Sequence, residues 1–300
     1  MKIAAITAYG GPEVLTIGDV PTPVPGPGEA LVAVVASTIN PVDVKTRMPG
    51  TPQQVGSLPA VLGWDIAGIV ITAPSGSGWA PGDRVIAMHP PTPDGAGSWQ
   101  QYAAIPAARL APAPESVDLL TAATLPLAGL TADQALARLD VREHERLLVT
   151  GAGGGVGGMA VQLAAARGIK TAGLVSRPEH EPAVLALGAA SAHSNPVTAG
   201  EFNAIFDTAG IFEHPHLLRE GGRLITVSDD TIPEGVNQRA AGADHNYVQH
   251  DPRRLRELAG LVDAGKLVLR VAESYPLSRI EHAHRRAEAG GMLGKVALSL

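Results

Sequence analysis

The sequence contains no cysteine, few aromatic residues and no hydrophobic segment long enough to span a bilayer. The missing cysteines exclude a disulfide framework, thiolate metal sites and a cysteine nucleophile, and they fit a reducing compartment. The uncharged stretch 119–132 is too short for a membrane span and is interrupted by Pro126 and Gly129. The N-terminus lacks the longer apolar core of a secretory signal. We therefore expect a soluble, cytoplasmic protein.

A strongly basic region is also missing. The formal net charge is −6, and no block of lysine and arginine is visible, so the electrostatic footprint of a nucleic-acid-binding protein is absent. Apolar residues make up 45% of the 300 residues and charged residues 17%, which is a globular composition. The chain is long enough for one or two domains with a large core. We therefore expect a globular protein without a nucleic-acid partner.

The pattern of apolar residues, prolines and glycines along the sequence changes near residue 120. Residues 1–120 hold short apolar runs, such as 30–35 and 84–88, between many prolines and glycines, which indicates an irregular β-rich domain. From residue 121, apolar strands alternate with helices, which predicts a parallel sheet covered on both faces. We expect strands at 146–150, 171–176, 204–207 and 223–227, and helices at 156–167 and 183–187.

The last part of the chain contains a helix with clear ends. Asp251 and Pro252 are suited to the N-cap and the first turn, and Gly265 is suited to the position after the last turn. Leucines and a valine between residues 255 and 262 form one apolar stripe. The final strand, 295–300, can return to the first domain.

The strongest chemical pattern is a glycine-rich turn. Six of residues 151–158 are glycine, and they follow the apolar strand 146–150 and open the next helix. This is the context that the dinucleotide fingerprint requires. In the favoured register Ala152 makes the tight turn, Gly154 lets the backbone approach a pyrophosphate, and Gly157 lets helix and strand pack closely. The segment 154–157, which includes Gly155 and Val156, would bind the pyrophosphate at the helix N-terminus.

The end of the second strand indicates which nicotinamide cofactor is used. NAD sites usually place an acid there. Here the strand ends with Ser176 and Arg177, and both can bind a 2′-phosphate. Glu179 and Glu181 come only after Pro178. The pattern therefore favours NADPH over NADH, although Arg177 could also be an ordinary surface residue.

Further motifs extend through the whole chain, and with them the sequence resembles the zinc-independent quinone oxidoreductases of the medium-chain dehydrogenase/reductase superfamily, the group that includes zeta-crystallin. The motifs lie at residues 40–47, 63–70, 82–85, 125–132, 206–210 and 294–296. The resemblance implies an α/β protein with a GroES-like β-rich substrate domain, residues 1–120 completed by 266–300. It also implies a Rossmann domain with a doubly wound parallel sheet at 121–265, an active site between the domains, and a homodimer.

The same resemblance assigns further residues to the site. It places Asn40 and Thr131 near the nicotinamide, Val227 and Ser228 after a strand that closes the site, and Lys295 among the cofactor residues. The sequence departs from the family in three respects. Segment 231–251 looks short, Asn195 stands where a tyrosine often lies near the 2′-phosphate, and Lys45 stands where relatives have a tyrosine.

Catalytic zinc is not expected. Zinc-dependent relatives use cysteine and histidine with a Gly-His-Glu segment, whereas this chain has Gly63, Trp64 and Asp65 and no cysteine. Two His-x-His pairs remain, at 214–216 and 282–284. Residues two apart on a helix do not face each other, so the second pair could chelate only from a non-helical backbone. We expect no functional metal.

Hydride transfer from NADPH to a quinone or an α,β-unsaturated carbonyl is the predicted reaction, with placement and electrostatics supplied by the protein. Asn40 could orient the cofactor or the acceptor, or it could serve only the turn before Pro41. Lys45 could stabilise negative charge on the acceptor oxygen, or it could be a solvated surface residue. Asp43 could order this turn. Two alternatives stay open: an alkenal or enone reductase with little quinone activity, and an NADPH-binding sensor or structural protein.

Overall fold

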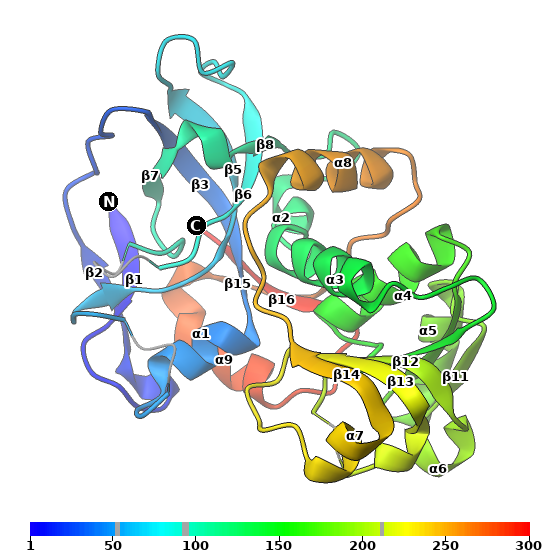
Figure 1. Ribbon diagram of the computed structural model, residues 1–300. Helices are drawn as coiled ribbons and strands as arrows, with labels where there is room; N and C mark the ends of the chain where they lie inside the picture. The colour runs from blue at the N-terminus through cyan, green and yellow to red at the C-terminus, as the bar shows by residue number, and fades with distance from the viewer. Residues whose placement is uncertain (52–54, 92–95, 211–212) are drawn as a thin grey trace.

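The computed structural model describes residues 1–51, 55–91, 96–210 and 213–300. The chain forms two domains that lie side by side, and Figure 1 shows the C-terminal segment crossing back to the N-terminal domain. No helix in these residues is both long and apolar enough to cross a membrane.

The first domain is built on a seven-stranded sheet that joins the two ends of the chain. Its order is β15 (Val271–Pro276), β16 (Lys295–Ser299), β3 (Glu29–Ile39), β5 (Asp65–Thr72), β6 (Arg84–Met88) and β8 (Ala111–Pro112), with β7 (Tyr102–Pro106) paired to β3. A three-stranded sheet contains β2 (Leu15–Asp19), β1 (Lys2–Ile6) and β4 (Ala60–Val61). Helices α1 (Pro41–Arg47) and α9 (Ile280–Glu288) pack together beside these sheets. The short α2 (Leu119–Ala122) leads into the second domain.

The second domain contains a six-stranded parallel sheet. Its order is β11 (Ser191–His193), β10 (Lys170–Leu174), β9 (Arg146–Thr150), β12 (Phe202–Asp207), β13 (Leu218–Thr226) and β14 (Ala240–His245). This is the doubly wound order in which the chain reverses direction beside the first strand. The helices of this domain are α3 (Pro126–Leu139), α4 (Gly155–Ala166), α5 (Glu181–Ala186), α6 (Pro196–Ala199), α7 (Glu234–Arg239) and α8 (Pro252–Asp263).

The largest hydrophobic core packs the group α3, α4 and α8, which Figure 1 shows stacked on one side of the parallel sheet, against that sheet. The same core extends into the first domain through residues of β3, β5 and β6. The group is also joined by charge, because Asp133 on α3 accepts hydrogen bonds from Arg254 at 2.7 and 2.8 Å and pairs with Arg167 after α4. This packing fixes α4, and with α4 the glycine turn that precedes it.

The main elements expected from the sequence are confirmed, with ends shifted by a few residues. The strand 146–150 is β9, and the final strand is β16, which pairs with β3 in the first domain. Asp251 caps α8 by accepting a hydrogen bond from the Arg254 backbone N–H at 2.8 Å. Gly265 follows α8 with a φ of 68°, as expected for its position. The segment 231–251, which looked short, forms α7 and the edge strand β14.

Candidate active site

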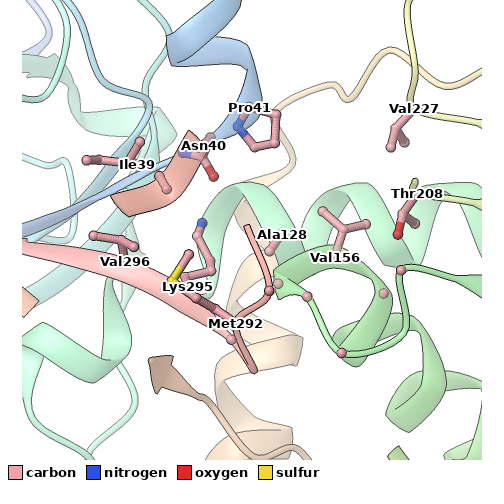
Figure 2. A pocket seen from close by; sticks show the side chains of 18 of the residues that line it. Ile39, Asn40, Pro41, Ala128, Val156, Thr208, Val227, Met292, Lys295 and Val296 are labelled. Atoms are coloured by element: carbon pink, nitrogen blue, oxygen red, sulfur yellow. The ribbon is translucent and has the colours of Figure 1, made fainter. Parts of the chain in front are cut away.

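A cleft of about 570 Å³ separates the two domains. One wall comes from the first domain, through the end of β3, the start of α1 and the turn before β16. The opposite wall comes from the glycine turn and the ends of β10, β12 and β13. Figure 2 shows Asn40 and Lys295 on one side of this cleft and Val156 and Thr208 on the other. The carboxyl ends of parallel strands beside a change in strand order are the usual ligand site of this kind of sheet.

The glycine turn fits a pyrophosphate. Gly151 opens the tight turn with a φ of 58°, and the Gly154 backbone N–H closes it by donating to the Gly151 carbonyl oxygen at 2.9 Å. Ala152 is the second residue of this turn and is fully buried. A Cβ on Gly157 would lie 2.3 Å from the carbonyl oxygen of Gly151, so the close approach of helix and turn requires glycine there. The first backbone N–H groups of α4 have no partner within the helix and are available to an anion.

The strand ends beside the turn are held by one carboxylate. Asp207 accepts hydrogen bonds from Thr150 Oγ1 at 2.6 Å and from Thr226 Oγ1 at 2.9 Å, so it joins the ends of β9, β12 and β13. Thr208 donates to the carbonyl oxygen of Thr150 at 2.6 Å. These bonds form a rigid edge for the cleft, and Thr208 and Val227 lie along it.

A buried ion pair lies at the first-domain end of the cleft. Lys295 Nζ donates to Asp65 Oδ2 at 2.8 Å, and these side chains are 6% and 0% exposed. The same oxygen accepts from Asn40 Nδ2 at 2.9 Å and Thr38 Oγ1 at 2.5 Å, while Asp65 Oδ1 accepts from the Leu127 backbone N–H at 2.7 Å. The carboxylate therefore fixes the position of Asn40 and Lys295 on the cleft wall.

Asn40 is also the N-cap of α1. Its backbone N–H donates to Asp43 Oδ2 at 2.8 Å, and the Gly63 backbone N–H donates to Asp43 Oδ1 at 3.1 Å. Asp43 is fully buried, and burial raises its pKa to about 7. Asp43 thus orders the turn, as the sequence suggested, and it does not line the cleft.

Two ion pairs border the cleft. Lys45 on α1 pairs with Asp229, which follows β13, so this pair bridges the two domains. Arg47 is 1% exposed and pairs with Glu288 on α9 at 2.5 Å. Lys45 is therefore on the cleft wall, as expected of a residue near the acceptor, with its charge already opposed by a carboxylate.

The end of β10 brings polar groups to the far end of the cleft. Ser176 and His180 both line it. Arg177 is exposed and lies outside the lining, with its guanidinium against Gly291, where a Cβ would lie 2.3 Å from Nη2. Gly291 itself lines the cleft, so the Arg177 side chain spans from the second domain to the turn before β16.

The structure brings most of the predicted site residues to one cleft. Those that line it are Asn40, Lys45, Gly154, Gly155, Val156, Gly157, Ser176, Val227 and Lys295. Those outside the lining are Thr131, Ala152, Arg177 and Ser228. Thr131 is buried on α3 and its hydroxyl has no partner among the described residues. Ser228 donates to Asp230 at 2.6 Å, beside the cleft.

Sequence reasoning missed three features of the cleft. Asp65 was identified only as part of a segment that excludes zinc, and His180 and Glu288 were not singled out. His180 lies on the chain close to Ser176, so its position after the second strand could have identified it. Nothing in the sequence pairs Asp65 with Lys295.

Comparison with known proteins agrees with this arrangement. The family described as alcohol dehydrogenase GroES-like domain matches residues 26–115, and the family described as zinc-binding dehydrogenase matches residues 185–298. A quinone oxidoreductase from Rattus norvegicus is 30% identical over all of this chain and 98% of its own length. The chain belongs to the quinone oxidoreductase-like branch of the medium-chain dehydrogenase/reductase superfamily.

Two further relatives support the same assignment. A chloroplastic NADPH-dependent alkenal/one oxidoreductase from Arabidopsis thaliana is 28% identical over 99% of this chain and 79% of its own length. The solved quinone oxidoreductase from Coxiella burnetii superposes with a TM-score of 0.89 at 28% identity, and the match covers all of this chain and 99% of the other. The fold is therefore the α/β fold of this superfamily, with a GroES-like and a Rossmann domain.

The histidine pairs of this family member take no part in the cleft. His282 and His284 lie on the regular helix α9, and His284 is buried against Trp99 with a ring separation of 5.0 Å. His214 and His216 contact each other edge-on at 5.7 Å, away from the cleft lining.

Proposed function

We propose that this protein transfers a hydride from NADPH to a quinone or an α,β-unsaturated carbonyl. The observation that carries the proposal is the cleft itself, where a glycine turn at a helix N-terminus faces Asn40 and Lys295 from the other domain. When bound, NADPH supplies the hydride, and the protein supplies placement and electrostatics. Relatives whose names specify quinones and alkenals support both acceptor classes equally.

In this proposal the backbone of residues 154–157 binds the pyrophosphate, and Ser176, His180 and Arg177 bind the 2′-phosphate. The side chains of Ser176, His180 and Arg177 can each donate hydrogen bonds, and no carboxylate from the end of β10 is among the residues that line the cleft. A site of this kind favours a phosphate over a bare ribose hydroxyl. The NADPH-dependent relative from Arabidopsis supports the same choice.

At the other end Asn40 orients the nicotinamide or the acceptor, since Asp65 fixes the amide by accepting a hydrogen bond from Nδ2. Val227, Val296 and Ile39 line this part of the cleft and exclude water from it. Lys45 contributes positive charge near the acceptor, in competition with Asp229. Solvent protonates the product in this scheme. We also propose the domain limits 1–120 with 266–300 and 121–265, a homodimer, and a cytoplasmic location.

The test is NADPH oxidation with quinones, alkenals and enones measured side by side, and with NADH as the alternative donor. We expect turnover with at least one acceptor class and a preference for NADPH. Tight NADPH binding without oxidation across the panel would instead assign the protein to the sensor or structural class. A preference for NADH would overturn the assignment of the 2′-phosphate site.

A further inference from the structure

Arg270 lies directly behind the glycine turn, on the side away from the cleft. It precedes β15, so it belongs to the part of the chain that returns to the first domain. Its Nη2 donates to the carbonyl oxygens of Gly153 and Gly154, each at 3.2 Å. The Gly153 carbonyl also accepts from the Gly294 backbone N–H at 3.0 Å. The turn is thus held from behind by two segments of the first domain.

The surroundings of Arg270 keep its side chain in this position. A Cβ on Gly158 would lie 2.0 Å from Nη2, so the guanidinium occupies space that only glycine leaves free on the first turn of α4. Gln162, one turn further along α4, donates to the Val268 carbonyl at 3.1 Å and accepts from the Val268 backbone N–H at 2.7 Å. These two bonds fix the chain just before Arg270 against α4.

The charge of Arg270 is not matched by an acid. Within the described residues no acid acts on it, and burial alone lowers its pKa, although an arginine stays protonated in a protein. A partly buried cation without a counter-charge is a cost to the fold. A pyrophosphate bound at the other side of the turn carries the opposite charge and would offset that cost.

Orientation adds to this effect. In a trans peptide the carbonyl and the following N–H point in opposite directions. The Gly154 carbonyl accepts from the Arg270 guanidinium at 3.2 Å and from the Gly158 backbone N–H at 3.0 Å, so both groups hold it on the side away from the cleft. The N–H of Gly155 therefore points the other way, and Gly155 lines the cleft. Arg270 therefore contributes the local positive charge and, together with the first helical hydrogen bond of α4, fixes the direction of the Gly155 donor.

We propose that Arg270 is a positioning residue for the cofactor pyrophosphate, acting through the glycine turn from the first domain. The inference rests on the proposed function, because it requires a dinucleotide in the cleft. It predicts which cofactor affinities are lost when Arg270 is removed. The pyrophosphate is common to NADPH and NADH, so removing Arg270 weakens both cofactors by a similar factor, whereas a residue that reads the 2′-phosphate affects NADPH alone.

The experiment measures dissociation constants of NADPH and NADH at fixed salt, together with the melting temperature of the cofactor-free protein. We expect Arg270→Met to weaken both cofactors about tenfold or more without lowering the melting temperature. Arg253→Met is the matched control, because it removes the same charge from a side chain that is 89% exposed on α8. It should leave both constants unchanged.

A second pair of variants, Gly158→Ala and its control Gly260→Ala, leaves Arg270 itself unchanged and tests the position of its guanidinium. Gly158→Ala should displace it and weaken both cofactors, while Gly260→Ala, a glycine on α8 with open space around it, should not. Arg270→Lys should give an intermediate loss, since it keeps the charge and loses the forked donor. If Arg270→Met does not fold, Arg270→Lys and Gly158→Ala decide the question.

Three results would overturn the proposal. They are cofactor constants within twofold of wild type in the folded variants, a loss confined to NADPH, or an equal loss in the two control variants. A wild-type protein that binds neither cofactor would instead refute the proposed function, and the inference with it. Cofactor binding by the wild-type protein therefore tests the proposed function. The dissociation constants of the variants relative to wild type test the role of Arg270.

Discussion

Replacing Lys295 with methionine tests whether the buried pair at the cleft stabilises the first domain. The variant keeps the aliphatic length and leaves the Asp65 carboxylate, 0% exposed, without its cation. Removing one partner of a buried pair costs roughly 3–5 kcal/mol, because a charge is left uncompensated. Three hydrogen bonds to Asp65 remain, from Thr38, Asn40 and Leu127, so we expect a loss near the lower end, about 3 kcal/mol.

The double variant Asp65→Asn with Lys295→Met separates the interaction between these two side chains from their interactions with the rest of the protein. Without either charge, most of the loss should be recovered, giving a coupling energy of about 2 kcal/mol or more. Lys2→Met is the control, because Lys2 pairs with Asp19 at 2.6 Å on the surface, with side chains 55% and 67% exposed. Exposed pairs contribute roughly 0–1 kcal/mol.

Denaturant unfolding followed by tryptophan fluorescence is the assay. All three tryptophans, Trp64, Trp79 and Trp99, lie in the first domain, so the signal reports the domain that contains Asp65. The reasoning is refuted if Lys295→Met costs less than about 1 kcal/mol, or if the double variant is as unstable as the sum of the single variants. Cofactor binding measured on the same variants separates an effect on the cleft from an effect on stability.

Four other outcomes follow from the structure. Gly157→Ala should lower cofactor affinity at least about tenfold, because its Cβ would lie 2.3 Å from the Gly151 carbonyl oxygen, and unchanged binding constants would contradict this. Arg177→Ala should weaken NADPH roughly tenfold to a hundredfold and spare NADH, and equal weakening would assign Arg177 to the loop. Burial lowers the pKa of His284 to about 3, so the free energy of unfolding should fall as the pH drops from about 6.5 towards 3. In acid unfolding curves, His284→Phe should reduce the slope of the free energy of unfolding against pH by about 1.4 kcal/mol per pH unit over this range. Exhaustive chelation should leave NADPH oxidation unchanged, and loss of turnover with removal of stoichiometric zinc would show that a metal is required.

Local patterns made much of the fold predictable. The strand 146–150, the glycine turn and the following helix are adjacent in sequence, so their periodicity and spacing were enough to place them. The cap of α8 was predictable for the same reason, since Asp251 bonds to a backbone group only three residues away. The register of the turn was harder. Six glycines within eight positions allow more than one tight turn, and nothing in the sequence shows that the positive φ belongs to Gly151.

The contacts that define the cleft could not be predicted because they join distant parts of the chain. Asp65 and Lys295 are 230 residues apart, and Arg47 and Glu288 are 241 apart. These pairs form because the C-terminal segment returns and places β16 beside β3. A carboxylate on one strand and a cation on another carry no sequence pattern that specifies their partner, so only the strand order reveals the pairing.

The Asp65 site illustrates the difference between excluding a chemistry and finding what replaces it. The missing cysteines, and tryptophan and aspartate at positions 64 and 65, argued against zinc bound as in the zinc-dependent relatives. They did not show how a buried acid would be neutralised there. The structure answers this with an ammonium group, a hydroxyl, an amide and a backbone N–H around one carboxylate. Because a buried charge needs both a counter-charge and hydrogen bonds, the burial of Asp65, which only the fold reveals, calls for a nearby cation, and the fold identifies it as Lys295.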